Sequence, residues 1–557
     1  MKNKYSKYLF LILIAVLFAT QFFFISPQGG FALNDDWVHT DTILHWVQTG
    51  NFRLMPFAGP TFYVPILYGA ALTKIFGFSF TLLRESTLVL TFFLLFTFYF
   101  LLNKFSNKPT LAFIGTLLLW TNPIFYNLSF TFMADIPALL FLILAIYFYF
   151  VGFEKNKNNY LFWGTIFGLF SAFTRQTGIL IVVAGFLYLI SKNSWSRLFF
   201  SKRGPSAAHP QQEKNNLRMN FYAKDILLSF LLPLAIAGAI YTWLNIYQLL
   251  PQNTVSHAIE RIWRLLGHIK WWLFYIPMYL GLFTLPLTLG WFAKQRKNWK
   301  DVKFWLIFFI ITDLTIAVRQ IWHLQFPYIG NLLSYYGLGP MKSVLTGNLT
   351  PLFPSWVWGI ITILAAFGLS LIAYLLLFHR QHKKTEPTGF IYLFAILYSI
   401  SLLIFESFDR YLLPLLLVLI IALLQNIKHV KFSYLTALIL ISILVLFSLT
   451  QTKFYLAWNE ARWNLAGYAT TLETDKTKID AGYEWDGWHN YWATLANEKL
   501  EFTDQEIQTR AWWQRRFFPA AKPEYIVSFS NLPDYQIIKQ EKIMGSNPNN
   551  NLYLLKK

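Results

Sequence analysis

The sequence has no cysteine among its 557 residues, and charged residues make up only 13% of it. The missing cysteine excludes disulfides, thiol catalysis and cysteine-ligated metals. Hydrophobic residues make up 55% of the chain, which is too apolar for a soluble protein of this size. The composition therefore predicts a protein that is embedded in a membrane.

Several signature motifs are missing as well. The chain has no P-loop, no glycine-rich dinucleotide fingerprint after a strand, no His-Glu-x-x-His and no Gly-x-Ser-x-Gly. Nothing therefore supports nucleotide hydrolysis or zinc proteolysis. The net charge of +20 would suit nucleic acid, but in membrane proteins Lys and Arg gather in cytoplasmic loops. We therefore expect no nucleic-acid partner.

Long apolar runs recur along the whole chain, and they do not alternate as the strands of a transmembrane barrel do. The predicted fold class is an all-α polytopic membrane protein with about 13 transmembrane helices, since a helix of roughly 20 apolar residues crosses a bilayer. The predicted spans are residues 8–26, 82–102, 110–127, 135–153, 160–174, 177–191, 226–248, 271–292, 303–322, 355–378, 389–405, 411–426 and 433–450.

The basic residues orient these spans. About half of the 47 Lys and Arg residues fall in the short segments that face one side, which is the cytoplasmic side by the positive-inside rule. Reading 160–191 as one kinked span would place the later basic loops outside, so two spans are favoured. We predict a multi-pass protein of the plasma membrane (the inner membrane of a bacterium) with a cytoplasmic N-terminus.

Three regions follow from this topology. Residues 1–450 form the membrane domain, and 27–81 within it form the first outer loop, with interfacial helices at 37–49 and 62–76. Residues 451–557 form a small extracytoplasmic α+β domain. Its predicted helices are 455–472 and 504–516, and its predicted strands lie at 526–529, 535–538 and 552–555.

Asp35 and Asp36 open the first outer loop and are the first candidates for catalysis. Partial burial and a like-charged neighbour raise the pKa of a carboxylate toward the range of a general base. The alternative is a solvated helix cap ahead of Trp37. His39 lies on the same helix face and could bind substrate or help to hold a metal, but an ordinary interfacial histidine also fits. The sequence requires no metal or other cofactor, and it leaves open whether a divalent cation takes part.

Three further charged residues are predicted at the outer mouths of helices. Asp135 either caps the helix that Pro137 begins or takes part in function. Arg175 and Arg410 are suited to phosphate recognition. The alternatives are snorkelling for Arg175 and a local ion pair for Arg410. Asp313 falls near the middle of a span, where an acid usually faces the bundle interior.

The first outer loop resembles that of the GT-C membrane glycosyltransferases, closest to the protein O-mannosyltransferase and aminoarabinose transferase groups. The resemblance is carried by Asp35-Asp36, Gly50, Pro56, Pro65, the run Ile75-Phe76-Gly77-Phe78-Ser79 and Leu83-Arg84. Further matches are Asp135-Ile136-Pro137, Arg175-Gln176-x-Gly178, Arg410-Tyr411-Leu412-Leu413-Pro414 and the stretch 482–488. In that family an Asp-Glu pair opens the loop, and its Asp is the implied base. Asp35 matches this Asp, and Asp36 replaces the Glu.

The chain also departs from the aminoarabinose transferases, which have a Lys before the proline that matches Pro65. This chain has Val64 there. The resemblance therefore leaves Arg175 and Arg410 as the leading phosphate-binding candidates, with Asp135 and His39 as further substrate-binding candidates.

The resemblance implies a polyprenyl-phosphate-dependent hexosyl or pentosyl transferase of the mannosyltransferase type. It would move a sugar from a polyprenyl-phosphate donor to an acceptor hydroxyl on the extracytoplasmic face, with inversion and with Asp35 as general base. The acceptor, which could be a lipid, a glycan or a protein, stays open. The rival interpretations are a lipid or sugar transporter, or flippase, and a non-catalytic assembly factor whose tail is a binding module.

Overall fold

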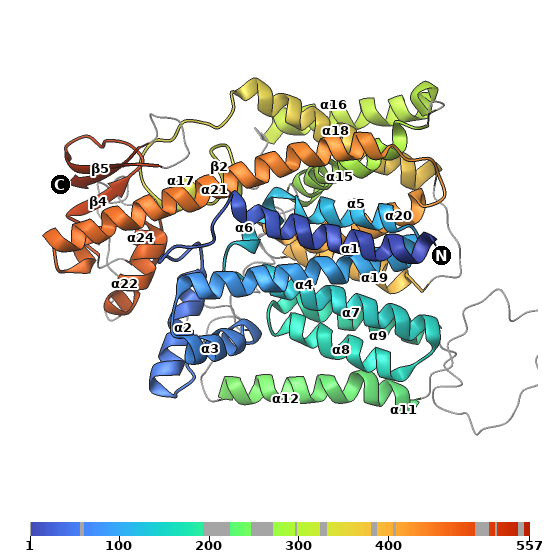
Figure 1. Ribbon diagram of the computed structural model, residues 1–557, viewed down its shortest axis with the longest axis horizontal. Coiled ribbons are helices and arrows are strands. Elements are labelled where there is room, and N and C mark those ends of the chain that lie inside the picture. Colours follow the sequence, from blue (N-terminus) through green and yellow to red (C-terminus); the bar gives the residue numbers. More distant parts are fainter. Residues whose placement is uncertain are drawn as a thin grey trace, which may run out of the picture.

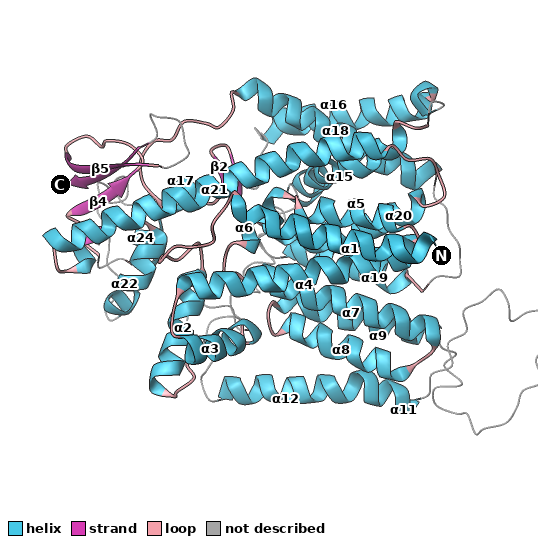
Figure 2. Cartoon of the chain, in the orientation of Figure 1, coloured by secondary structure: helices cyan, strands magenta, loops and turns pink. Residues whose placement is uncertain are grey.

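The computed structural model describes residues 2–55, 61–192, 223–246, 271–295, 298–322, 331–379, 387–404, 408–495, 512–518, 521–543 and 551–557. Most of this chain forms a bundle of helices that run roughly along one another (Figures 1 and 2). Each predicted span coincides with a helix within the described residues. The fold class predicted from the sequence is therefore confirmed.

Eight helical segments in the described part are long and apolar enough to cross a membrane. Four of them are single helices: Phe80–Ser106 (α4), Asp135–Lys155 (α7), Ser355–Phe378 (α18) and Tyr434–Leu472 (α21). A fifth, Val302–Ile321, is most of α16 (Val302–Trp322). The other three join consecutive elements: Ala223–Leu244 covers α11 (Ala223–Ile226), η4 (Leu227–Leu231) and most of α12 (Leu232–Ile246); Leu273–Phe292 covers part of η5 (Trp271–Tyr275) and α15 (Ile276–Phe292); and Asp409–Ile427 covers η7 (Asp409–Leu412) and α20 (Leu413–Ile427).

The other predicted spans are shorter or bent helices. α5 (Pro109–Trp120) and α6 (Pro123–Ser129) meet at an angle of 70°. The break has a local cause, because Asn122 caps α6 and Pro123 occupies its first turn. The remaining ones are α1 (Lys2–Thr20), α8 (Asn158–Ala172), α9 (Ile179–Lys192) and α19 (Gly389–Ile404). The 3-10 turn η2 (Gln176–Gly178) separates α8 from α9, so residues 160–191 form two helices rather than one, and their crossing of the membrane as two spans stays a prediction.

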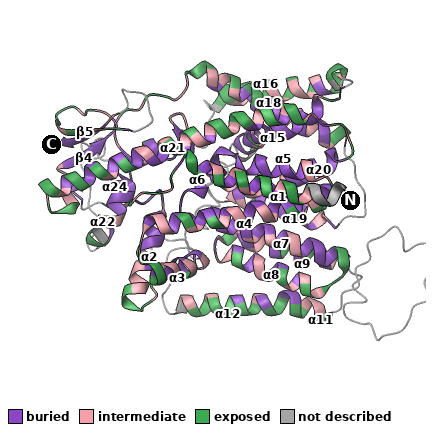
Figure 3. Cartoon of the chain, viewed as in Figure 1, coloured by how far each residue is buried: buried purple, intermediate pink, exposed green. Residues whose placement is uncertain are grey.

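The helices differ in how far they are enclosed. α7 and α20 are largely buried, whereas α12 and α16 lie at the periphery and expose apolar side chains (Figure 3). Such exposed apolar faces suit contact with lipid. Asp313 is exposed on α16, so the expectation that it faces the bundle interior is wrong.

One end of the bundle carries the helices of residues 27–81, which are predicted to be the first outer loop. α2 (Asp36–Thr49) runs across the ends of the spans, and α3 (Val64–Phe76) packs beside it (Figure 1). α2 ends at Gly50, whose φ of 74° is left-handed, and α3 ends at Gly77 with φ 83°. Both glycines end their helices as predicted, because such backbone angles favour glycine.

The last helix is longer than predicted. α21 runs unbroken for 39 residues from Tyr434 to Leu472, and it connects the bundle to the C-terminal region (Figure 1). The expected end at residue 450 and a separate helix over 455–472 are therefore wrong. The composition becomes polar after Leu449, but no glycine or proline interrupts the chain there, so the backbone continues as helix. The division of the chain into two domains stays a prediction.

The tail forms a small sheet beside α21. Its strand order is β3-β4-β6-β5, with β3 (Ile479–Asp480) parallel to β4 (Tyr525–Ser528) and the other pairs antiparallel. The three predicted strands correspond to β4, β5 (Gln536–Lys542) and β6 (Asn551–Lys556). α22 (Tyr483–Leu495) packs against β3, and α24 (Trp512–Phe517) packs against α22. Residues 504–511 of the predicted helix 504–516 lie outside the described residues, and the rest of it falls in α24.

Candidate active site

Asp35 occupies the N-cap position of α2, yet its side chain makes no capping hydrogen bond. Asn34 before it has a left-handed backbone with φ 54°. Instead of capping, one carboxylate oxygen of Asp35 (Oδ1) accepts a hydrogen bond from the Tyr483 hydroxyl at 3.1 Å. The other oxygen (Oδ2) lies 3.4 Å from Nη2 of Arg410. The Asp35 side chain keeps 28% of its surface exposed, so it can still meet a substrate.

Asp36 has a different environment. Its carboxylate is buried and accepts a hydrogen bond from the backbone N–H of Phe132 at 3.0 Å. Burial raises the pKa of Asp36 to about 7, against the opposing charge of Arg84. Arg84 donates to the carbonyls of Pro27 and Phe31 at 2.6 and 2.8 Å, and so holds the chain that leads to the pair. The Asp36 carboxylate is therefore turned into the protein, toward the backbone of Phe132. Its catalytic role stays a prediction.

The raised pKa of Asp36 predicts a pH-dependent stability. The folded state keeps a proton that the unfolded chain releases above its ordinary pKa of 3.8. The stabilisation is therefore complete below that value and is lost as the pH rises through about 7. We expect Asp36→Asn to flatten the decline of the thermal unfolding midpoint over this range, measured in detergent. An Asn variant with the wild-type pH dependence would contradict the assigned protonation.

His39 is enclosed on the same helix. Its ring stacks on Phe62 with centroids 3.5 Å apart. Burial and, secondarily, the charge of Arg410 lower the pKa of His39 to about 3, so the imidazole is neutral. Within the described ranges, no group of three or more His, Asp or Glu side chains is placed to hold a metal ion. The substrate-binding role of His39 stays a prediction.

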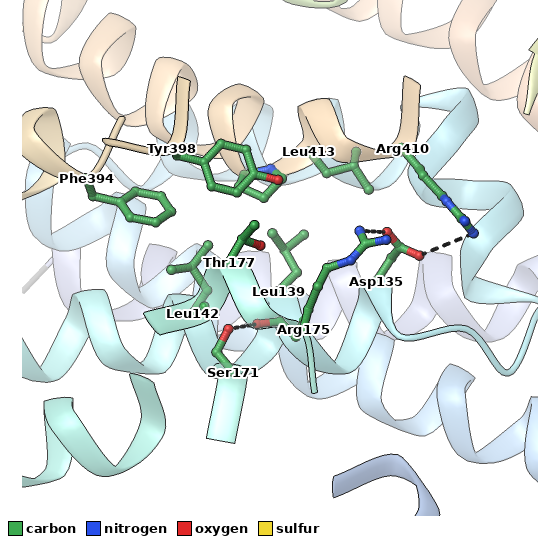
Figure 4. Close-up of a pocket in the computed structure, with 13 residues that line it drawn as sticks. Asp135, Leu139, Leu142, Ser171, Arg175, Thr177, Phe394, Tyr398, Arg410 and Leu413 are labelled. Carbon is green, nitrogen blue, oxygen red and sulfur yellow. Dashed lines mark hydrogen bonds and ion pairs between the residues drawn. The ribbon is translucent and has the colours of Figure 1, made fainter. Parts of the chain in front are cut away.

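The charged residues predicted at separate helix mouths come together. Asp135 at the start of α7 pairs with Arg175 at the α8–α9 turn, and its second oxygen lies 4.0 Å from Nη1 of Arg410 (Figure 4). The result is a chain of alternating charge that runs from Asp35 through Arg410 and Asp135 to Arg175. The Arg175 guanidinium also stacks over the Tyr411 ring at 4.2 Å. Asp135 therefore joins the two arginines.

A small, partly open pocket begins at this charged chain (Figure 4). Its mouth carries Asp135, Arg175 and Arg410. The N–H groups at Nε and Nη1 of Arg410 are buried and have no hydrogen-bond partner among the described residues. The remaining lining is mostly apolar and comes from α7, the α8–α9 turn, α19 and α20: Ala138, Leu139, Leu142, Ser171, Thr177, Gly178, Phe394, Tyr398, Leu413 and Pro414. The lining therefore combines charged side chains at one end with a mostly apolar wall.

The tail contributes to this site, although no pattern in the sequence predicted that it would. Tyr483 contacts Asp35, and the neighbouring Glu484 accepts a hydrogen bond from the backbone N–H of Asn34 at 2.9 Å. The stretch 482–488 stood out in the sequence as a family resemblance. Its spacing carried no signal that these residues meet Asp35, about 450 positions earlier in the chain.

Comparison with known families supports a specific class of enzyme. The family model described as dolichyl-phosphate-mannose-protein mannosyltransferase matches residues 64–209. The resemblance to the GT-C membrane glycosyltransferases is confirmed. The matched stretch is a minority of the chain and includes Asp135 and Arg175, whereas Asp35 precedes it and Arg410 follows it. No curated protein and no solved structure matches the chain. The chain is thus similar to mannosyltransferase-like enzymes that are built from membrane helices.

Proposed function

We propose that this protein transfers a sugar from a polyprenyl-phosphate donor to an acceptor hydroxyl, on the outer face of the membrane. The single observation that carries the proposal is the placement of Asp35. Its partly exposed carboxylate is one arginine away from a pocket that is cationic at its mouth and apolar within. A base, a phosphate site and a path for a lipid chain then form one continuous site.

The donor fits this pocket by its chemistry. The phosphate would take hydrogen bonds from Arg410 and Arg175, because the guanidinium fork matches phosphate oxygens. The polyprenyl chain would run along Leu139, Leu142 and Phe394, where burial of hydrocarbon is favourable. The sugar would then face Asp35. The name of the matching family also specifies a lipid-phosphate sugar donor.

The proposed reaction is a single displacement. Asp35 takes the proton of the acceptor hydroxyl as the acceptor oxygen bonds to the anomeric carbon. The bond from that carbon to the phosphate oxygen breaks, and its electron pair leaves with the polyprenyl phosphate. The arginines stabilise the charge that develops on the departing phosphate. One displacement inverts the configuration at the anomeric carbon.

The rival transporter interpretation gains no support from Asp313. A transport site would place ionisable residues toward the interior near the midplane, whereas Asp313 is exposed on the peripheral α16. Asp35 and Asp135, which pair with arginines, lie instead at the end of the bundle that carries α2.

The phosphate assignment is tested with Arg175→Gln. Because a hydrogen bond to a charged group contributes about 1.5–3 kcal/mol, we expect the KM for the lipid-linked donor to rise roughly 10- to 100-fold. The matched control is Arg53→Gln, because Arg53 stacks on Trp492 at 4.5 Å and does not line the pocket. Steady-state kinetics with varied donor measure both variants. Equal donor KM values in the wild type and the Arg175 variant would refute the assignment.

A further inference from the structure

The C-terminal tail reaches the carboxylate that the proposed function uses. Tyr483, the first residue of α22, donates to Oδ1 of Asp35 at 3.1 Å, while Arg410 faces Oδ2 at 3.4 Å. The two oxygens are therefore held from two sides by groups from different parts of the chain. Burial raises the pKa of Tyr483 well above its ordinary value, so the hydroxyl stays a donor. A donor on each oxygen fixes the plane of the carboxylate.

The turn before Tyr483 is closely packed. Gly482 has φ +92°, and a Cβ added there would lie 2.4 Å from the carbonyl oxygen of Val344 and 2.7 Å from Nη1 of Arg462. The Asp480 carboxylate accepts a hydrogen bond from the Gly482 N–H at 2.8 Å. Only glycine fits this position without strain, so the start of α22 is held in one place.

Glu484 connects the tail to the backbone beside Asp35. One of its carboxylate oxygens accepts from the Asn34 N–H at 2.9 Å, and the other pairs with Nη1 of Arg462 at 2.7 Å. Both side chains of this ion pair are fully buried. Arg462 belongs to the extended part of α21, so α21, α22 and the Asp35 loop are joined at one point.

Aromatic packing joins the same two regions. Trp37, two residues after Asp35, is buried against Tyr483, Tyr491 and Phe518 with centroids 5.7 to 6.2 Å apart. A Cβ on Gly487 would lie 2.3 Å from the Trp37 ring. The ring thus lies directly on α22, and the tail cannot leave without uncovering it.

From these contacts we propose that the C-terminal tail completes the active site, with Tyr483 as a positioning residue that aims the Asp35 carboxylate at the acceptor hydroxyl. This inference rests on the proposed function. It assigns the tail to the reaction itself and not to a separate binding module. Tyr483 acts through Asp35, so its loss affects the chemical step and leaves donor binding, which belongs to the arginine pocket, unchanged.

The test is Tyr483→Phe in the full-length protein. Because the lost bond is to a charged acceptor, we expect kcat to fall about 10- to 100-fold with the donor KM unchanged. Thermal unfolding checks that the variant is still folded. Tyr491→Phe is the matched control: it removes a hydroxyl from the same helix and the same Trp37 packing, and leaves the Asp35 contact intact. We also expect Tyr483→Phe to cause no further loss of kcat when it is introduced into the Asp35→Asn variant. The effects of two substitutions are not additive when the residues act as a unit.

The outcomes separate the two proposals. If Asp35→Asn is inactive and Tyr483→Phe has the wild-type kcat, the positioning role is overturned and the proposed function stands. If Tyr483→Phe lowers the residual rate of Asp35→Asn as strongly as it lowers the wild-type rate, the tyrosine acts independently of Asp35 and the inference fails. If Asp35→Asn is fully active, both proposals fail.

Discussion

Asp35→Asn is expected to lower kcat by about 10²- to 10⁴-fold, the range that a positioned general base contributes. The amide keeps the size of the carboxylate but cannot take the acceptor proton. Donor binding is expected to persist, because the pocket mouth is formed by Asp135, Arg175 and Arg410. The rate of sugar transfer, measured with saturating donor and acceptor, gives kcat directly.

The control for this prediction lies on the same helix. Asp41 in α2 accepts a hydrogen bond from Trp492 Nε1 at 3.1 Å, and an amide oxygen can replace the carboxylate there. We expect Asp41→Asn to keep a kcat within a few-fold of the wild type, as for most changes outside the reacting groups. A wild-type rate in a folded Asp35→Asn variant would remove Asp35 from the mechanism.

The second large effect is on stability. Glu484→Gln leaves the fully buried guanidinium of Arg462 without its counter-charge. Removing one partner of a buried pair costs about 3–5 kcal/mol. We therefore expect a large fall in the free energy of unfolding of the tail. Denaturation in detergent micelles can follow it through the fluorescence of the tryptophans near this pair, since Trp458 lies over Arg462 at 5.0 Å.

An exposed ion pair in the same region provides the comparison. Glu524 and Lys478 lie 2.8 Å apart, close to the 2.7 Å of the buried pair, but their side chains are 47% and 39% exposed. Glu524→Gln is expected to cost less than about 1 kcal/mol. Adding Arg462→Met to Glu484→Gln should recover part of the loss, because it removes the unpaired charge. Equal losses for Glu484→Gln and Glu524→Gln would show that the buried pair does not stabilise the tail.

The fold class could be predicted from the sequence because membrane spans depend on local composition. A helix such as α7 (Asp135–Lys155) shows its length and apolarity in one continuous stretch. The break between α8 and α9 was also visible, through the charge of the loops that follow it. The end of α21 was not, since polar residues continue a helix as readily as apolar ones.

The candidate site was visible only in pieces. Asp35, Asp135, Arg175 and Arg410 each stood at a predicted helix mouth, but nothing local showed that they form one chain of charge. Arg410 is 375 positions from Asp35, and pairing over such a separation is set by helix packing. Tyr483 was harder still, because a tyrosine in a polar tail has no pattern that distinguishes a partner of Asp35 from a surface residue.

The difference between Asp35 and Asp36 also needed the structure. No local feature of the sequence separates the two carboxylates, and only the family resemblance favours Asp35 as the base. Their side chains point to different partners: Asp36 to the backbone of Phe132, and Asp35 to Tyr483 and Arg410. A one-residue step around a helix start separates the buried carboxylate of Asp36 from the partly exposed carboxylate of Asp35.

The most direct test of the central claim is the release of polyprenyl phosphate. Purified wild-type protein and Asp35→Asn would be incubated side by side with a panel of polyprenyl-phosphate sugars and candidate acceptors in lipid vesicles. The account predicts that the wild type releases polyprenyl phosphate from at least one donor, in step with a glycosylated product, and that the variant releases far less. Movement of an intact donor across the vesicle without release, or equal release by both proteins, would contradict it.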